Sequence, residues 1–157
     1  MEDQYGPQAT IRRNFRGAKI LLIEDNPDHC TIIQSVLEQS MPEVDLLIAA
    51  TGEQALNQLG LCQELEQALP RLILLDLYLP EREDGWKLLQ LLKEPESPYR
   101  LIPVTLLSHS EEPQDVQMGY DLGISSYIVK PTSFERWLLY FQSLRQYWWQ
   151  TVTLPLH

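Results

Sequence analysis

The feature that most constrains this chain is a set of polar residues, each of which stands where a short apolar run ends. The run 18–23 ends at Glu24 and Asp25, the run 72–75 at Asp76, the run 103–107 at Ser108, and the run 125–129 at Lys130. Apolar runs of this length, separated by helical stretches, are typical of buried strands in a parallel sheet. Ligands bind outside the carboxyl ends of such strands. The sequence therefore predicts one site that combines carboxylates, a hydroxyl and an ammonium, which suits a divalent metal and a phosphoryl group.

Composition narrows the class of protein. A chain of 157 residues with 44% hydrophobic content fits one globular domain with a sizeable core. Its net charge of −10 predicts a surface that repels nucleic acid. The apolar runs are far shorter than a membrane span, and the first residues lack the apolar stretch of a signal peptide. We therefore expect a cytoplasmic protein that binds neither nucleic acid nor membrane.

Strands and helices are expected to alternate along the chain, which predicts a doubly wound α/β domain. We expect strands at 18–23, 44–49, 72–75, 103–107 and 125–129, and helices at 27–39, 51–67, 86–94, 114–122 and 132–149. The segment 77–85 is expected to be a loop. Right-handed crossovers favour the strand order 2-1-3-4-5, which places the polar strand ends side by side. We expect residues 1–17 to form a leader, 18–149 the domain and 150–157 a C-terminal tail.

The carboxylates at these strand ends predict a magnesium site. Mg²⁺ prefers near-octahedral oxygen coordination, which Glu24, Asp25 and Asp76 could supply. A rigidly held Asp76 beside the metal is a plausible nucleophile toward phosphorus, and Lys130 would neutralise charge on the transferring group. Each residue taken singly has a structural alternative: Asp25 could stabilise a helix N-terminus, Asp76 could begin a turn, and Ser108 could merely end a strand.

Taken together and in this order, the residues resemble one known family, the response-regulator receiver domains of two-component signalling. The matching motifs are the pair Glu24-Asp25, the aspartate within 74–80, the hydroxyl of Ser108 and the pair Lys130-Pro131. Tyr127, three residues before the lysine, matches the family's switch aromatic. The resemblance covers residues 18 to about 145. It implies the flavodoxin-like (βα)5 receiver fold.

The resemblance also implies a reaction. Asp76 would accept phosphate from a phosphohistidine of a sensor histidine kinase, and the phosphoaspartate would then hydrolyse slowly. Glu24, Asp25, Asp76 and the backbone carbonyl of Tyr78 would hold Mg²⁺. The protein would be a phosphoacceptor in signalling rather than an enzyme.

The remaining motif residues have implied roles in recognition and switching. Ser108 and Lys130 would contact the phosphoryl oxygens, and Tyr127 would turn inward once Ser108 moves. Of these roles, only that of Tyr127 has no independent argument from the residues, because an aromatic side chain on a late strand is otherwise part of the core.

The sequence departs from the family pattern at several positions. Glu24 stands where aspartate is frequent, and His109 follows Ser108 where small residues are common. His109 and the large Tyr78 could narrow the access of attacking water, although an exposed loop histidine is an equal alternative. The loop 81–85 is one residue longer than the usual form. None of these departures removes a required group.

The last helix carries more apolar residues than one face can bury. Helical spacing places Phe134, Trp137, Leu138, Phe141, Leu144 and Trp148 on one face and leaves Leu139, Tyr140, Tyr147 and Trp149 on others. The tail 150–155 could fold back over these residues. We expect instead a homodimer interface. Its expected residues are Trp137, Tyr140, Tyr147, Trp148 and Trp149.

Two segments narrow the resemblance. The start 24–27 and the end 147–155 are similar to those of small cyanobacterial response regulators partnered with phytochrome-type kinases. This similarity implies a stand-alone receiver downstream of a light-sensing histidine kinase.

Other functions fit less well. A pseudo-receiver, an adaptor that keeps the fold without phosphotransfer, is the main alternative, but Asp76 and Lys130 are both present. A phosphatase of similar topology would need a second aspartate where Tyr78 stands. A nucleotide binder would need a glycine-rich loop after the first strand, where the sequence has 24–27 instead.

Overall fold

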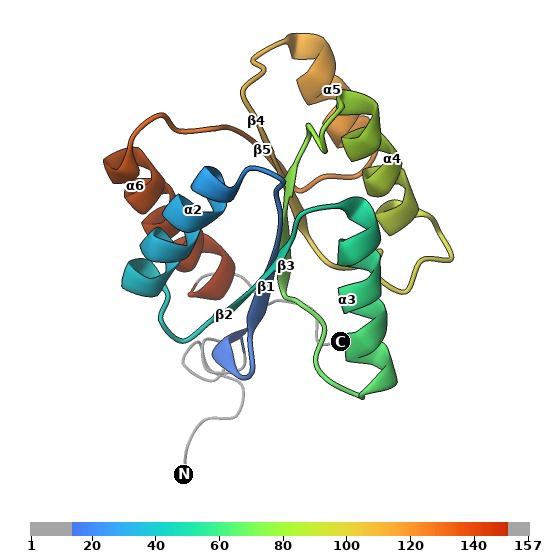
Figure 1. The fold of residues 1–157 in the computed structure, drawn as a ribbon, viewed down its shortest axis with the longest axis horizontal. Coiled ribbons are helices and arrows are strands. Elements are labelled where there is room, and N and C mark those ends of the chain that lie inside the picture. Colours follow the sequence, from blue (N-terminus) through green and yellow to red (C-terminus); the bar gives the residue numbers. More distant parts are fainter. Residues whose placement is uncertain (1–13, 151–157) are drawn as a thin grey trace.

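The structure is a computed structural model that describes residues 14–150. Five parallel strands form one sheet in the order β2-β1-β3-β4-β5, which confirms the expected fold class (Figure 1). The strands are β1 (Lys19–Ile23), β2 (Asp45–Ala49), β3 (Leu72–Asp76), β4 (Val104–Ser108) and β5 (Ser126–Val129). Each lies within a residue or two of its expected position.

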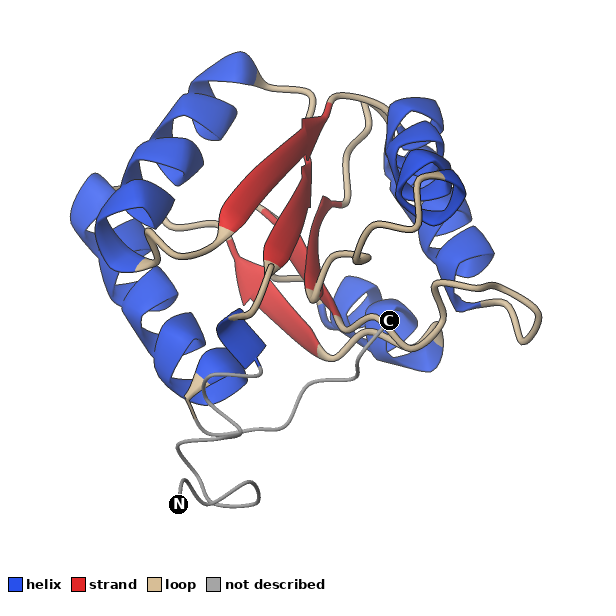
Figure 2. Ribbon diagram, turned by 90° about the horizontal axis from the view of Figure 1, so that it is seen from below, coloured by secondary structure: helices blue, strands red, loops and turns tan. Residues whose placement is uncertain are grey.

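Helices cover both faces of the sheet (Figure 2). They are α2 (Pro27–Ser40), α3 (Gly52–Glu64), α4 (Arg82–Lys93), α5 (Pro113–Asp121) and α6 (Phe134–Leu144), which continues as the π-helix η1 (Arg145–Trp149). One core cluster joins the sheet to α3 and α4, and the other joins it to α2 and α6. Every residue of β3 and β4 is buried, because both faces of these inner strands are covered. None of the described helices is both long and apolar enough to span a membrane.

The expectation of a loop over 77–85 was wrong in its second half, because α4 begins at Arg82 and not at Trp86. The backbone N–H of Glu81 donates to the carboxylate of Asp84 at 3.1 Å, a cap that starts the helix early. Gly85 then packs directly on the preceding loop, where an added Cβ would collide with the carbonyl oxygen of Leu77. This early start brings Arg82 into contact with Asp115 in the first turn of α5.

The end of the last helix also differs from the expected pattern. The backbone N–H of Gln150 donates to the carbonyl of Arg145 at 3.0 Å, which is the i to i+5 bond of a π-turn. The wider turn moves the inward position from Trp148 to Trp149. Trp149 is therefore fully buried, at 0% exposure, whereas the expected α-helical spacing placed it on an uncovered face.

Residues from before the expected domain start contact this end. Asn14 Nδ2 donates to the carbonyl of Trp149 at 3.1 Å, and the ring of Phe15 lies 6.4 Å from that of Trp149. Tight packing therefore begins ahead of residue 18, within the segment that we expected to be a leader. The basic pair Arg12-Arg13 and the tail 151–157 lie outside the described residues.

Candidate functional site

The polar strand ends meet at one edge of the sheet. We call Glu24, Asp76, Ser108 and Lys130 the polar rim; all four are buried, whereas Asp25 is exposed beside them. They come together because β1, β3, β4 and β5 are neighbours in the sheet and run parallel, so that their carboxyl ends coincide. The predicted convergence of these residues is confirmed.

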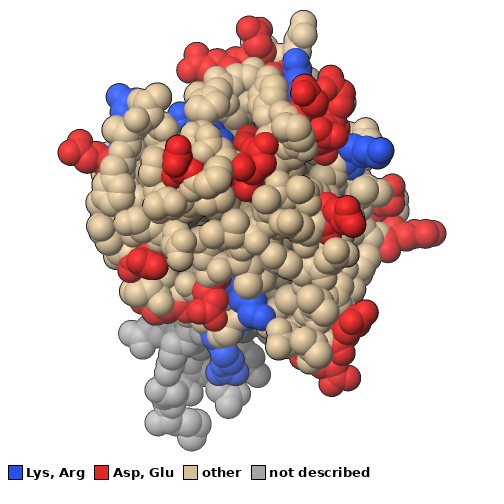
Figure 3. All heavy atoms as spheres, in the orientation of Figure 1, with Lys and Arg blue, Asp and Glu red and all other residues tan. Residues whose placement is uncertain are grey.

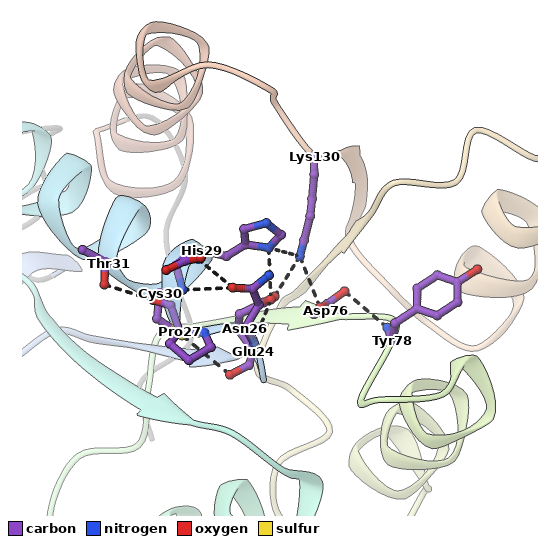
Figure 4. A network of polar contacts seen from close by, with 10 residues as sticks. Glu24, Asn26, Pro27, His29, Cys30, Thr31, Asp76, Tyr78 and Lys130 are labelled. Carbon is purple, nitrogen blue, oxygen red and sulfur yellow. Dashed lines mark hydrogen bonds and ion pairs between the residues drawn. The ribbon is translucent and has the colours of Figure 1, made fainter.

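Lys130 is the centre of the polar contacts. Its Nζ donates to Glu24 Oε2 at 2.9 Å and to Asp76 Oδ2 at 3.2 Å (Figure 4). Lys130 is only 4% exposed and Asp76 5%, so these charges are stabilised by one another and not by water. Removing one partner of such a buried pair leaves an uncompensated charge, which is costly.

The surroundings of Asp76 alter its acidity. Burial raises the pKa of Asp76 to about 6, and the neighbouring Glu24 adds to the rise, while Lys130 opposes it. The backbone N–H of Tyr78 donates to Asp76 Oδ1 at 3.2 Å and also favours the ionised form. Asp76 is therefore held at both carboxyl oxygens, and it is a weaker acid than an exposed aspartate.

The donor set fits a divalent cation. Oxygen atoms of Glu24, Asp25 and Asp76 all lie within 4.8 Å of one another. Carboxylate oxygens are the ligands that Mg²⁺ and Mn²⁺ prefer, and a cation would relieve the repulsion between the three groups. These residues could hold such an ion. A part for the Tyr78 carbonyl stays a prediction.

Ser108 and Tyr127 are joined through the loop between β4 and α5. The backbone N–H of Ser110 donates to Ser108 Oγ at 3.0 Å, and Tyr127 OH donates to the carbonyl of Ser110 at 2.8 Å. The Tyr127 side chain is half-buried in this arrangement. The two predicted switch residues are thus connected through a third residue that the sequence did not single out.

His29 is a residue of the site that the sequence interpretation missed. Its Nδ1 lies 3.0 Å from Lys130 Nζ and 3.2 Å from Glu24 Oε1 (Figure 4). Burial and then the neighbouring Lys130 lower the pKa of His29, which favours a neutral ring. The helix cap at Asn26 was the signal in the sequence that could have indicated His29. Asn26 accepts from the backbone N–H of Asp28 at 2.9 Å, so α2 starts at the polar rim and its first turn faces the rim.

His109 is exposed, and its ring lies 5.7 Å from that of His29 in an edge-on arrangement. Both rings line a pocket of about 240 Å³ next to Lys130. The large His109 side chain therefore lines the pocket through which a small molecule would reach Lys130. Its effect on attacking water stays a prediction.

The expected interface residues divide into buried and accessible groups. Trp137 and Trp149 are buried within the chain, so they are not free to form an interface in this conformation. Tyr147 is 56% exposed and lines, with Tyr140 and Trp148, a pocket of about 320 Å³ beside β5. Of the expected set, Tyr147 is therefore exposed, whereas Tyr140 and Trp148 are half-buried against the core.

The chain is similar to known response regulators. It is 33% identical to response regulator Rcp1 of Synechocystis over 137 residues, which are 87% of this chain and 92% of Rcp1. It is 35% identical to the regulatory protein FilR2 of Methanothrix harundinacea over 129 residues, which are 82% of each chain.

Solved structures agree with these relatives. The phosphorylated cyanobacterial phytochrome response regulator RcpA matches with a TM-score of 0.76 and 32% identity, over 88% of this chain and 98% of RcpA. A Mn²⁺-bound form of response regulator Rcp1 matches with a TM-score of 0.72 and 32% identity, over 88% and 99% of the two chains. The expected resemblance to small cyanobacterial regulators is confirmed. The family model of the response regulator receiver domain matches residues 20–141, and the chain belongs to this family, the receiver-domain response regulators of two-component signalling.

Proposed function

We propose that Asp76 is the phosphoacceptor of this response regulator. An oxygen of its carboxylate attacks the phosphorus of a phosphohistidine on a sensor histidine kinase, the P–N bond breaks, and an aspartyl phosphate forms. Slow attack by water later returns the free carboxylate. The observation that carries the proposal is the position of Asp76, buried at the end of an inner strand, within 4.8 Å of two acidic residues and 3.2 Å from Lys130 Nζ.

The proposed reaction depends on a divalent cation, which we assign as Mg²⁺ held by Glu24, Asp25 and Asp76 with the Tyr78 carbonyl. The support is the cluster of carboxylate oxygens within 4.8 Å and the Mn²⁺-bound form of the relative Rcp1. When bound, the cation would neutralise negative charge on the transferring phosphoryl group.

Lys130 and Ser108 are proposed to recognise the phosphoryl group. Lys130 Nζ already contacts Asp76 and can follow an added phosphoryl oxygen without a large movement. Ser108 ends the neighbouring strand, where Asp76 pairs with the preceding Leu107. We propose that the Ser108 hydroxyl turns to the phosphoryl oxygen and that Tyr127 then moves inward.

The proposed partner is a cytoplasmic sensor histidine kinase of the phytochrome type. Support comes from RcpA, which is a phytochrome response regulator and matches nearly along its whole length. The pseudo-receiver alternative gains no support from the site, because Asp76 and Lys130 are in contact.

We also propose a homodimer that forms through the outer side of α6 and η1. Tyr147, Trp148 and Tyr140 line an apolar pocket there, and the adjoining edge strand β5 leaves Val129 41% exposed. An exposed Tyr147 with half-buried aromatic neighbours next to a sheet edge suits a two-fold contact between identical surfaces.

Phosphorylation with acetyl phosphate, followed by mass spectrometry, tests the central proposal. The intact protein should gain one phosphoryl group in the presence of Mg²⁺ and none after chelation. Asp76→Asn should abolish the gain, and the control Asp45→Asn, at an exposed aspartate, should keep it. Label on another side chain would overturn the assignment of Asp76 as the phosphoacceptor. An unmodified protein under all conditions would favour an adaptor that acts without phosphotransfer.

A further inference from the structure

Ser110, in the loop between β4 and α5, uses each of its polar groups in a contact with a different element. Its backbone N–H donates to Ser108 Oγ at 3.0 Å, and its carbonyl accepts from Tyr127 OH at 2.8 Å. Its hydroxyl donates to Asp115 Oδ2 at 2.5 Å. Ser110 therefore joins the two proposed switch residues to one another and to α5.

Asp115 gives this loop a fixed anchor. It lies in the first turn of α5, is 1% exposed, and accepts the Ser110 hydroxyl through one carboxylate oxygen. Its other oxygen forms an ion pair with Arg82 Nη2. A hydrogen bond to an ionised group is stronger than one between neutral groups, and the arginine compensates the buried charge.

Through Asp115, Arg82 connects the two loops that flank the site. It is the first residue of α4 and follows the loop after Asp76, whereas Asp115 follows the loop after Ser108. Figure 1 shows α4 and α5 side by side on the same face of the sheet. The contacts form one continuous path from the N-terminus of α4, through Asp115 and Ser110, to Ser108 and Tyr127.

We propose that Asp115, supported by Arg82, is a positioning residue that holds Ser108 and Tyr127 in their resting arrangement by fixing Ser110. The inference rests on the proposed function, in which Ser108 turns toward a phosphoryl group on Asp76. That turn breaks the bond from the Ser110 N–H, and the inward movement of Tyr127 breaks the bond to the Ser110 carbonyl. The strength of the contact between Asp115 and Ser110 then sets how strongly the resting arrangement is favoured over the arrangement in which Ser108 has turned toward Asp76.

The competing explanation is that these contacts only stabilise the start of α5. An acidic side chain in the first turn favours a helix, and the Ser110 hydroxyl also accepts from the backbone N–H of Glu112 at 3.2 Å. A stabilising role of this kind predicts a lower melting temperature in the variants but leaves Tyr127 and the phosphorylation rate unchanged. The two explanations therefore differ in what they predict for Tyr127.

The test uses the full chain with Ser110→Ala, which removes only the hydroxyl, and Asp115→Asn, which removes the charge but keeps an acceptor. The matched controls are Ser143→Ala and Asp121→Asn, at exposed positions. Tyrosine-selective NMR of the unphosphorylated protein, with Tyr127 assigned by Tyr127→Phe, reports its position. The rate of phosphorylation by acetyl phosphate with Mg²⁺ reports the free energy needed to move Ser108 toward Asp76.

Both variants should move the Tyr127 signal toward its position in the phosphorylated wild type, while the controls stay at the wild-type position. Loss of one hydrogen bond should raise the phosphorylation rate about five- to tenfold. Unmoved Tyr127 signals with unchanged or slower phosphorylation would overturn the proposal. If the wild type accepts no phosphate, the proposed function fails, but displacement of Tyr127 by Ser110→Ala would still support the positioning role, and its absence would refute it. Ser110→Ala also covers the case in which Asp115→Asn fails to fold.

Discussion

The polar rim and the aromatic end of the chain are both buried, yet they are stabilised in different ways. We define the aromatic end by the buried Trp137, Phe141 and Trp149 with the half-buried Phe15, which belong to one apolar cluster. The ring of Phe15 lies 6.4 Å from that of Trp149, and the ring of Trp137 lies 6.3 Å from that of Phe141. Each group of the polar rim depends on a specific partner, as Lys130 does on Glu24 and Asp76. An ion can replace a lost charge, whereas nothing in solution replaces a lost ring. Buried charge is therefore adjustable by ligands, and buried apolar area is not.

The largest effect is expected at the aromatic end. Trp149→Ala should lower the free energy of unfolding by about 3–5 kcal/mol, because it removes a fully buried ring and leaves a cavity. Urea unfolding measures the change. Trp149→Phe should cost clearly less, since the indole N–H has no acceptor among residues 14–150. An equal loss from both variants would contradict an explanation based on buried area.

Lys130→Met should destabilise the metal-free protein by about 3 kcal/mol, because Glu24 and Asp76 lose their buried cation. Millimolar Mg²⁺ should restore part of this loss, since ligand binding to the folded state raises its stability. The same Mg²⁺ should not restore Trp149→Ala beyond its effect on the wild type. Lys87→Met, at an exposed lysine, is the control. If Mg²⁺ restored the same stability to Lys130→Met and Trp149→Ala, the proposed difference between the polar rim and the aromatic end would be wrong.

Asp25→Asn should weaken Mg²⁺ binding at least about tenfold while leaving the fold intact, because Asp25 is exposed and contributes a proposed ligand. Isothermal titration calorimetry measures the affinity. Asp28→Asn, at an exposed aspartate in the first turn of α2, should bind Mg²⁺ nearly as the wild type does. Undiminished affinity in Asp25→Asn would exclude it as a ligand.

Magnesium affinity should also fall as the pH drops through about 6, the raised pKa of Asp76, because a proton then competes for the carboxylate. Without metal, the folding stability contributed by Asp76 depends on pH in the opposite sense and falls as the pH rises. The folded protein binds this proton more tightly than the unfolded chain, whose pKa stays near 3.8, so the stabilisation is complete below pH 3.8 and is lost as the pH rises through 6. Calorimetric titrations from acid to neutral pH measure the magnesium affinity. The change in this affinity near pH 6 should be absent in Asp76→Asn.

The smallest effect is expected at the surface beside the aromatic end. Tyr147→Glu should weaken the proposed homodimer about fivefold without changing stability, because this side chain is 56% exposed. Light scattering across a concentration series measures the shift, with Leu65→Glu, at an exposed residue of another helix end, as the control. A wild type that is monomeric at tens of micromolar would rule out this interface.

Most of the fold followed from local sequence patterns. The apolar runs predicted all five strands and their order, because residues buried on both faces must be continuously apolar and parallel crossovers have a fixed hand. The start of α4 was missed because the cap formed by Glu81 and Asp84 lies in the polar segment 81–85, which has no apolar helical spacing to mark it as helix. Trp149 was misplaced because the π-turn changes the period on which helical spacing depends.

The sequence by itself determined which groups meet at the polar rim, since each stands at or directly after the last residue of a strand and the strand order aligns their carboxyl ends. Only the tertiary structure decided which partners these groups have. His29 reaches Lys130 across 101 positions of the chain, and Arg82 reaches Asp115 from another helix. Local periodicity is set by neighbours in sequence, but a buried charge must find its partner among groups that folding brings close. The identity of those partners therefore appears only once the helices have packed on the sheet.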